Sequence, residues 1–324
     1  MNELTKSRRQ LLEILDGGTS LSSDDIFRLE GSLLADVENF ETRALLLAAY
    51  RGNRKEKMAD YVRHLTWFVD RSPDSELLRL LPLEINSFDV SLYGSVKVHW
   101  LTVLEGTPVN TAALGNCADF FLANDEIALA EKALAKGRLI EPNNSIWVRR
   151  LCDLNERAAL KGDGERWSAA LDLCQVAIEM SENQSLKLLE LIRLCNLANA
   201  INDSDKAIKV AHSLLFMSEE IPTEQLDLAY AMHVANTIMG IVALKNGQIN
   251  QAREYLQQSI PLSRSIAIYE LGPDLSLASD LLSTGEKMAV TNFLDAFEQI
   301  DVCNQARDKL NSWRQRIIGR LESS

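Results

Sequence analysis

The sequence contains few side chains whose types and spacing could perform chemistry. Asp60 and His64 lie four residues apart, which places both on one face of a helix, where they could act as an acid–base pair or as two metal ligands. A site of either kind needs further groups, and the next histidine, His99, is distant in the chain. His64 and His99 each precede a tryptophan, Trp67 or Trp100. We therefore predict that these histidines pack structurally, and we predict no catalytic residue and no metal site.

The cysteines are the second group of side chains that could take part in catalysis or bind a metal. They are Cys117, Cys152, Cys174, Cys195 and Cys303, an odd number that is never spaced as C-x-x-C. Neither a disulfide framework nor a zinc-binding pair follows from this spacing. The first four lie at or beside apolar repeat positions, where a small, soft side chain packs well. A catalytic thiol needs a base and an electropositive setting, and the sequence indicates neither.

Motifs of the common cofactor and catalytic sites are absent, among them G-x-x-x-x-G-K-[ST], G-x-G-x-x-G, H-E-x-x-H and G-x-S-x-G. The glycine-bearing segment 161–164 precedes a predicted helix, and a helix N-terminus can bind phosphate. A turn between two helices explains the same glycines better. The sequence therefore predicts no cofactor and no enzymatic activity.

The net charge and the hydropathy pattern limit the classes of partner that we expect. The formal net charge is −12, whereas nucleic acids and anionic membranes attract basic surfaces. Solubility is the simplest explanation of that charge. The N-terminal residues show no apolar signal core, and the most apolar stretch, 229–244, is interrupted by His233, Asn236 and Thr237. We expect a cytoplasmic protein that binds neither nucleic acid nor membrane.

Helical periodicity runs through nearly the whole chain, so helices would position the residues considered above. Ala and Leu dominate, aromatic residues make up only 6%, and short breaks rich in Gly, Pro, Asn and Asp separate the periodic segments. The stretch 96–103 alternates like a strand, but its neighbours are helical and we predict a helix there. The fold class is therefore expected to be all-α, built from helices joined by tight turns.

Small residues recur along the chain at intervals that indicate repeats. The recurring positions are Ala130, Ala170, Ala207, Ala252 and Val290, at steps of 40, 37, 45 and 38 residues. A second register agrees with the first in two places. Gly240 lies seven residues before Gly247, and Ala278 lies seven before Gly285. In each case the recurring small residue follows the turn glycine by five positions, so we predict that Gly240 and Ala252 meet where two helices cross.

These positions resemble the tetratricopeptide repeat, whose unit reads W-x2-L-G-x2-Y, then A-x3-F, then P. One unit fits at Leu114, Cys117, Ala118, Phe121, Ala130, Leu134 and Pro142, and another at Asn236, Met239, Gly240, Ala243, Gly247, Ala252 and Leu256. A weaker third comprises Leu45, Ala49, Leu65, Phe68 and Pro73. The resemblance implies a right-handed α–α superhelix, a solenoid of antiparallel helix pairs. Small residues at the crossings let the helix backbones approach.

Segments 42–73, 114–121 and 277–286 also resemble an uncharacterised group of bacterial repeat proteins, which implies a fold but no activity. We expect a single repeat array over 1–324. Its expected parts are an N-terminal helix or cap at 1–23, divergent repeats at 24–109, clearer repeats at 110–298, and a C-terminal capping helix at 299–324. The longer units and missing aromatic residues depart from the strict repeat.

Repeat arrays of this kind expose the first helix of each unit on a concave inner face, so polar residues there are candidates for binding a partner. The candidates are Arg43, Tyr50, Arg54, Asp119, Leu122, Arg149, Asp153, Arg157 and Lys245, with Glu156 beside Arg157. Arginine pairs well with carboxylates, so the partner would be a protein or peptide with an acidic segment. An ordinary solvated helix face is the alternative explanation of the same residues.

The predicted function is a non-catalytic protein–protein interaction module: an adaptor, a chaperone-like carrier or a neutralising partner. Two other functions stay open. One is an enzyme whose site on a helical scaffold is not recognisable from motifs. The other is an RNA-binding helical-repeat regulator, which the net charge of −12 disfavours.

Overall fold

The computed structural model describes residues 8–52, 54–107, 110–220, 228–261 and 263–322. Over these ranges the chain forms seventeen α-helices and one short 3₁₀ helix, and no strand occurs in them. The all-α prediction is therefore confirmed. The chain divides into two compact units, Met1–Leu154 and Asn155–Ser324, and each is described by itself.

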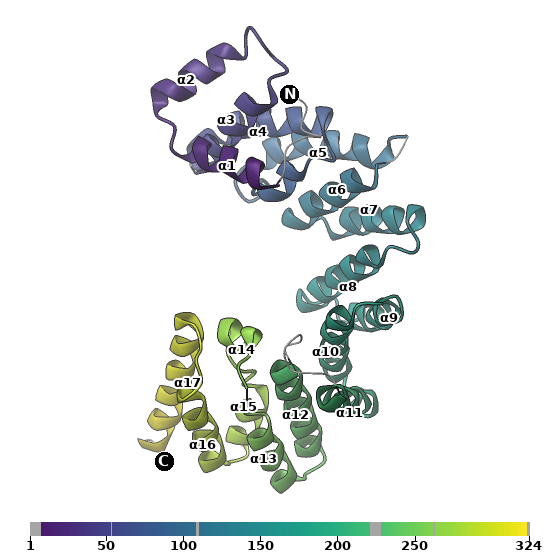
Figure 1. The fold of residues 1–324 in the computed structure, drawn as a ribbon, viewed down its shortest axis with the longest axis vertical. Helices are drawn as coiled ribbons and strands as arrows, with labels where there is room; N and C mark the ends of the chain where they lie inside the picture. The colour runs from purple at the N-terminus through teal and green to yellow at the C-terminus, as the bar shows by residue number, and fades with distance from the viewer. Residues whose placement is uncertain (1–7, 53, 108–109, 221–227, 262, 323–324) are drawn as a thin grey trace. The chain divides into compact units, whose positions relative to one another are not determined.

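The first unit contains the helices from α1 to α7 and most of α8 (Figure 1). Its elements are α1 (Arg8–Thr19), α2 (Ser23–Ser32), α3 (Phe40–Arg51), α4 (Arg54–Arg71), the 3₁₀ helix η2 (Glu76–Leu80), α5 (Val90–Glu105), α6 (Thr111–Ala123), α7 (Ile127–Ile140) and most of α8 (Ser145–Leu160). The strand-like stretch 96–103 lies inside α5, where Val96 and Trp100 are buried. The prediction of a helix there is confirmed.

The second unit takes in the end of α8 and the remaining helices. These are α9 (Arg166–Glu179), α10 (Gln184–Ala200), α11 (Ser204–Glu220), α12 (Leu228–Lys245), α13 (Ile249–Gln258), α14 (Ile266–Leu271), α15 (Ser276–Ser283), α16 (Lys287–Glu298) and α17 (Asn304–Glu322). α14 is an additional short helix that lengthens the connection between α13 and α15. α17 lies within 299–324, where the sequence predicts a C-terminal capping helix, and its Leu310 is buried. The capping role stays a prediction.

One turn geometry recurs between the helices of a pair. A residue with positive φ ends the first helix, and the N–H of the next residue donates to the carbonyl five positions back. The positive-φ residues are Asp125, Gly162, Asn202, Gly247 and Gly285, at φ of 62°, 112°, 59°, 74° and 93°. They mark five helix–turn–helix units: α6–α7, α8–α9, α10–α11, α12–α13 and α15–α16. The repeat read from the sequence is thus present as a repeated turn.

The small residues of the predicted repeat are all core residues of second helices. Ala130, Ala170, Ala207, Ala252 and Val290 are completely buried. Gly240 has different neighbours from those predicted. A Cβ added to it would overlap Leu277 Cδ2 on α15 and would lie 3.1 Å from Tyr255 Cβ on α13. Gly240 therefore lies where α12 crosses both its partner helix and the next unit, and Ala252 is not among its nearest neighbours.

α12 is the most enclosed helix of the second unit, because helices pack on several of its sides. Fourteen consecutive or nearly consecutive side chains between Leu228 and Ala243 are buried. Within the described residues, α12 is the one helix long and apolar enough to cross a membrane, and 78% of it is buried inside the protein. An apolar composition together with this degree of burial is typical of a helix in the core of a protein.

Candidate functional site

The three candidates from α3 and α4 each have internal partners. Arg43 donates from Nε and Nη2 to the Val37 carbonyl, at 3.1 and 2.8 Å, and its guanidinium lies 4.7 Å from the Trp67 ring centroid. Tyr50 is buried, 5% exposed. Arg54 donates to the Glu84 carbonyl at 2.9 Å and lies over the Phe88 ring. Their role in binding a partner stays a prediction.

Four candidates lie on α6 and α8 within the first unit. Asp119 accepts a hydrogen bond from Arg150 Nη2, which also donates to the Gly115 carbonyl at 3.0 Å. Burial raises the pKa of Asp119, and the Arg150 charge opposes that rise. Leu122 and Arg149 are half-buried and Asp153 is exposed. The Asp119–Arg150 pair thus ties two first helices together.

Arg157 and Lys245 belong to the second unit, and both are exposed. Lys245 ends α12 and donates from Nζ to Asn202 Oδ1 at 2.9 Å and to Asn199 Oδ1 at 3.3 Å. It therefore bridges to the positive-φ turn of the preceding helix pair. Arg157 follows Glu156 near the end of α8, and Glu156 lines the groove described next.

A groove of about 330 Å³ lies where the end of α8 meets α10, the first helices of consecutive pairs. It is lined by Glu156, Trp167, Leu189, Ile192, Arg193, Asn196, Leu197 and Ala200. Arg193 Nε contacts Glu156 Oε1 at 2.7 Å, and both side chains are only 24% exposed. The groove therefore has a neutralised ion pair among apolar walls.

The side chains at the opening of this groove suit contact with a peptide. Leu189 is 55% exposed although it is apolar, and Asn196 is exposed on the same helix. A carboxamide can donate to and accept from a peptide backbone at once. The sequence pointed to this side of the helix pairs through Glu156 and Arg157, but it gave no residue of α10. The only pattern in the sequence that could have indicated α10 is that Leu189 and Asn196 lie seven residues apart, which places them on one face of a helix.

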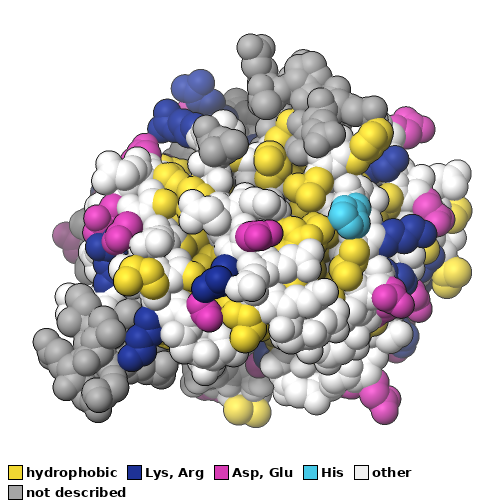
Figure 2. Space-filling view, turned by 90° about the horizontal axis from the view of Figure 1, so that it is seen from below, with side chains coloured by type: hydrophobic (Ala, Val, Ile, Leu, Met, Phe, Trp, Pro, Cys, Tyr) yellow, Lys and Arg dark blue, Asp and Glu magenta, His cyan; other side chains and the backbone are white. Residues whose placement is uncertain are grey.

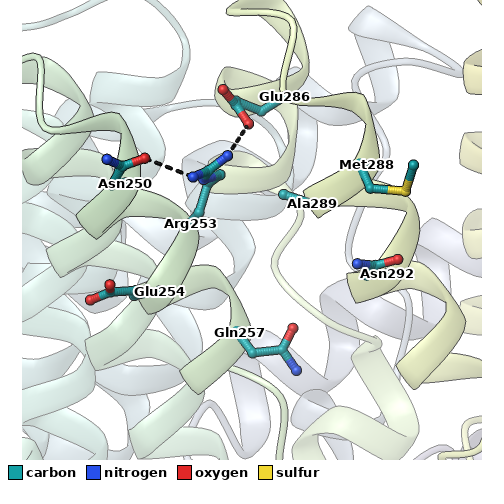
Figure 3. Close-up of a pocket in the computed structure, with 8 residues that line it drawn as sticks. All are labelled: Asn250, Arg253, Glu254, Gln257, Glu286, Met288, Ala289 and Asn292. Atoms are coloured by element: carbon teal, nitrogen blue, oxygen red, sulfur yellow. Dashed lines mark hydrogen bonds and ion pairs between the residues drawn. The ribbon is translucent and has the colours of Figure 1, made fainter.

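A second, larger groove of about 540 Å³ lies between the second helices α13 and α16 (Figure 3). Its lining residues are Asn250, Arg253, Glu254, Gln257, Glu286, Met288, Ala289 and Asn292. Arg253 spans one end, donating to Glu286 Oε2 at 3.1 Å and to Asn250 Oδ1 at 2.7 Å. Gln257 points from α13 toward α16. Six of its eight lining residues are polar or charged, and it provides no aromatic anchor, unlike the α8–α10 groove.

The Asp60–His64 pair considered from the sequence does not form. Asp60 pairs with Arg63 at 3.2 Å, whereas His64 Nε2 lies 2.9 Å from Glu30 Oε1 on α2. The same Glu30 oxygen accepts from Tyr50 at 2.7 Å and from Arg63 at 2.7 Å. His64 is completely buried, as its prediction as a packing residue implies.

Protonation in this Glu30 cluster follows from its contacts. Arg43 Nη1 donates to His64 Nδ1 at 3.3 Å, so His64 is the neutral tautomer that donates from Nε2 to Glu30. Burial lowers the pKa of His64, against the opposing effect of Glu30. Burial alone would raise the pKa of Glu30, but hydrogen bonds from Tyr50, His64 and Arg63 outweigh it and hold that pKa below its usual range.

Two further histidines and two of the cysteines that could be reactive are also buried or paired within the protein. His233 is completely buried, and His99 Nδ1 lies 2.6 Å from Asp70 Oδ1. Burial raises the pKa of the Cys117 and Cys195 thiols to about 12, which disfavours a reactive thiolate. Among the residues that the structure describes, no group of three His, Cys, Asp or Glu side chains is placed to hold a metal ion.

The face of the molecule shown in Figure 2 carries side chains of both charges. On the face in Figure 2, hydrophobic side chains are interspersed with polar ones. The Lys and Arg side chains visible there lie among Asp and Glu, so the described residues of that face carry no continuous basic patch.

Comparison with known proteins gives little further information. No family model matches the sequence, and no curated protein matches it. A chain in the crystal structure of the APC/C hetero-tetramer Cut9–Hcn1 is similar at a TM-score of 0.38 and 17% sequence identity. The similarity covers 96% of this chain and 56% of that one, so this chain spans about half the length of the other. Nothing about function follows from a likeness at this level.

Proposed function

We propose that this protein is a non-catalytic interaction scaffold that holds a segment of a partner protein in the groove between α8 and α10. The observation that carries the proposal is the combination of an exposed leucine, Leu189, an exposed carboxamide, Asn196, and an aromatic wall, Trp167, in one groove. Aromatic and apolar anchors bordered by polar groups are typical of interaction hot spots. An apolar side chain of the partner would enter beside Trp167 and Leu189.

Polar groups at the groove would fix the orientation of the bound segment. The Asn196 carboxamide would pair with the N–H and C=O of one partner residue. Arg157, exposed on α8, would attract an acidic residue flanking that segment. Arg193 pairs with Glu156 and lines the same groove. We therefore propose a partner segment with an apolar anchor and a neighbouring Asp or Glu.

The cellular setting follows as part of the same proposal. An adaptor, a chaperone-like carrier and a neutralising partner all require only this kind of binding. The net charge of −12 supports a protein partner over nucleic acid or an anionic membrane, and we place the protein in the cytoplasm. Neither groove presents a nucleophile with a base beside it, which supports a binding role over an enzymatic one.

Site-specific photo-crosslinking in cells tests the proposal. A photoreactive residue replacing Asn196 should capture a partner, whereas the same residue replacing Asp172, exposed on α9, should not. Leu189→Arg, combined with the photoreactive residue at position 196, should abolish the capture while the helical circular dichroism signal is retained. Equal capture at both positions, or capture that survives Leu189→Arg, would show that the partner does not bind in this groove.

A further inference from the structure

α2 is a helix that buries none of its own side chains. Phe27 on α2 is 80% exposed, and just after the helix Leu34 and Val37 are 87% and 55% exposed. In Figure 1, α2 lies at the margin of the first unit, and it contacts α3 and α4 through Glu30. Three exposed large apolar side chains close together in the chain make this segment a candidate interaction surface.

The helical state of α2 is specified locally, because packing does not supply it. Ser22 caps the helix by accepting from the Asp25 N–H at 3.2 Å, and Asp25 Oδ2 accepts from the Ser22 N–H at 3.2 Å. This capping box, with the Arg28–Asp25 ion pair, satisfies the first turn. A helix of ten residues is nevertheless marginal without a packed face.

One carboxylate, Glu30, fastens α2 to the rest of the unit. Its Oε1 accepts from Tyr50 on α3 and from Arg63 on α4, and it also contacts His64 Nε2. These contacts fix the orientation of α2 about its own axis. Phe27 precedes Glu30 by three residues and is 80% exposed, so its ring is presented to solvent in a defined orientation.

The charge of this segment selects the kind of partner. Residues 21–41 contain one basic residue, Arg28, which is paired with Asp25. The acidic residues are Asp24, Asp25, Glu30, Asp36, Glu38 and Glu41, so the segment has a net charge of −5. Arg63 and Arg71 of α4 pair with Glu30 and Glu38, and the segment together with these two arginines has a net charge of −3. An anionic membrane surface would be repelled by that field. A basic protein segment would be attracted to it, and apolar residues in that segment would cover Phe27 and Leu34.

We propose that Phe27 on α2 and Leu34 in the turn after it form a docking surface for an amphipathic helix of a partner protein that carries Lys or Arg beside its apolar positions. The partner helix packs along α2, placing apolar residues one and two turns apart against Phe27 and Leu34. Its basic residues pair with Asp24 and Asp36 at the flanks. This site lies in the first unit and does not depend on the α8–α10 groove.

A labelled Leu/Lys amphipathic peptide of about 18 residues, five helical turns, is the probe. Its fluorescence anisotropy should rise saturably with added full-length protein. The double change Phe27→Ser and Leu34→Ser should raise the Kd about tenfold or more. Leu139→Ser on α7, at an 82% exposed leucine, is the matched control and should leave the Kd unchanged.

Three further measurements separate this docking mode from others. A scrambled peptide of identical composition, which cannot form an apolar face, should bind at least about tenfold more weakly. A Leu/Glu peptide should not bind. Equal binding of the scrambled peptide, no saturable binding of the Leu/Lys peptide, or an unchanged Kd in the double variant would each overturn the proposal. Phe27-dependent binding to phosphatidylserine vesicles would also overturn it, in favour of a membrane surface.

Discussion

His233 connects three segments of the second unit through its two ring nitrogens. Nδ1 donates to the Ser259 carbonyl at 2.7 Å, and Nε2 accepts from the Asp274 N–H at 2.8 Å. The ring also lies edge-on to Phe297, 6.0 Å between centroids. Only the neutral imidazole can make both hydrogen bonds, and burial lowers the pKa of His233 accordingly. The histidine therefore fastens α12 to the connections on either side of α14.

The stability of the protein should consequently fall on mild acidification. His64 and His233 have pKa values below the ordinary 6.5 in the folded state, so the unfolded chain binds protons that the folded chain does not. With respect to these two histidines, the free energy of unfolding is highest at pH values above the histidine pKa of the unfolded chain. It decreases as pH falls from about 6.5 toward the lowered folded-state pKa values. Urea unfolding at about pH 7.5 and about pH 5.5, above the range where carboxylates titrate, measures the difference.

The contribution of His233 can be isolated by substitution. His233→Gln should lower the free energy of unfolding by about 1–3 kcal/mol at about pH 7.5, because a buried hydrogen bond is lost. The same variant should lose less stability than wild type between the two pH values. His212→Gln, at an exposed histidine on α11, should leave both measurements unchanged. A wild-type pH dependence in His233→Gln would contradict the assignment.

The Glu30 cluster makes a similar prediction for the first unit. Glu30→Ala removes the acceptor of Tyr50 and Arg63 and leaves Nε2 of the buried His64 without its Glu30 contact. The variant should expose the α2 amides to hydrogen exchange while α6 and α7 stay protected, because α2 has no buried side chain of its own. Glu13→Ala, at an exposed residue on α1, is the control and should not change α2 protection. Unchanged exchange in Glu30→Ala would mean that α2 is held by other contacts.

At the scale of elements, the crossing of α12 with its neighbours is the tightest point to test. Gly240→Ala should destabilise by about 1–3 kcal/mol, because the new methyl group overlaps Leu277 and crowds Tyr255. Adding Leu277→Ala should make the loss smaller than the sum of the two single changes. Gly94→Ala, inside α5 with no atom near the added Cβ, should instead be neutral or stabilising. Chemical denaturation of the four variants checks this, and additive losses would place Gly240 elsewhere.

Much of the element order could be predicted from the sequence, and the exceptions have physical reasons. Gly247 and Gly285 identified two turns because glycine adopts positive φ without strain. Asp125 and Asn202 make the same turn, but Asp and Asn are also common in helix caps and loops, so they gave no register. The close approach of Gly240 to Leu277 was not predicted, because the spacing within one unit carries no information about α15, which belongs to the next unit.

The candidate site was less predictable than the fold. Tyr50 and Arg43 read as surface residues because their types are polar, yet both are satisfied internally by Glu30, Val37 and His64. Conversely, the sequence did not single out Leu189 and Phe27, which are apolar and yet 55% and 80% exposed. Periodicity assigns an apolar residue to the core by default. An interaction surface made of apolar residues is therefore invisible to that criterion until neighbours are known.

At the scale of the whole molecule, the proposed surfaces differ in the sign of the charge they favour. The α2 segment has a net charge of −5 and favours basic partners, while Arg157 beside the α8–α10 groove favours an acidic one. Both lie within a chain of net charge −12, which repels acidic molecules at long range. A local arginine must therefore act within about one Debye length, roughly 10 Å at 0.1 M salt.

Charge reversal at Arg157 tests whether that local field matters. Arg157→Glu should weaken capture of the partner at Asn196 while leaving binding of the Leu/Lys peptide to α2 unchanged. Lys209→Glu, at an exposed lysine on α11, changes the net charge by the same amount and is the control. It should affect neither interaction, because the distant field is screened. Raising salt from about 0.05 to 0.5 M should weaken the wild-type groove interaction more than that of Arg157→Glu, since screening removes what the variant has already lost. If Lys209→Glu weakens capture equally, the net charge of the molecule governs binding and Arg157 has no special place in it.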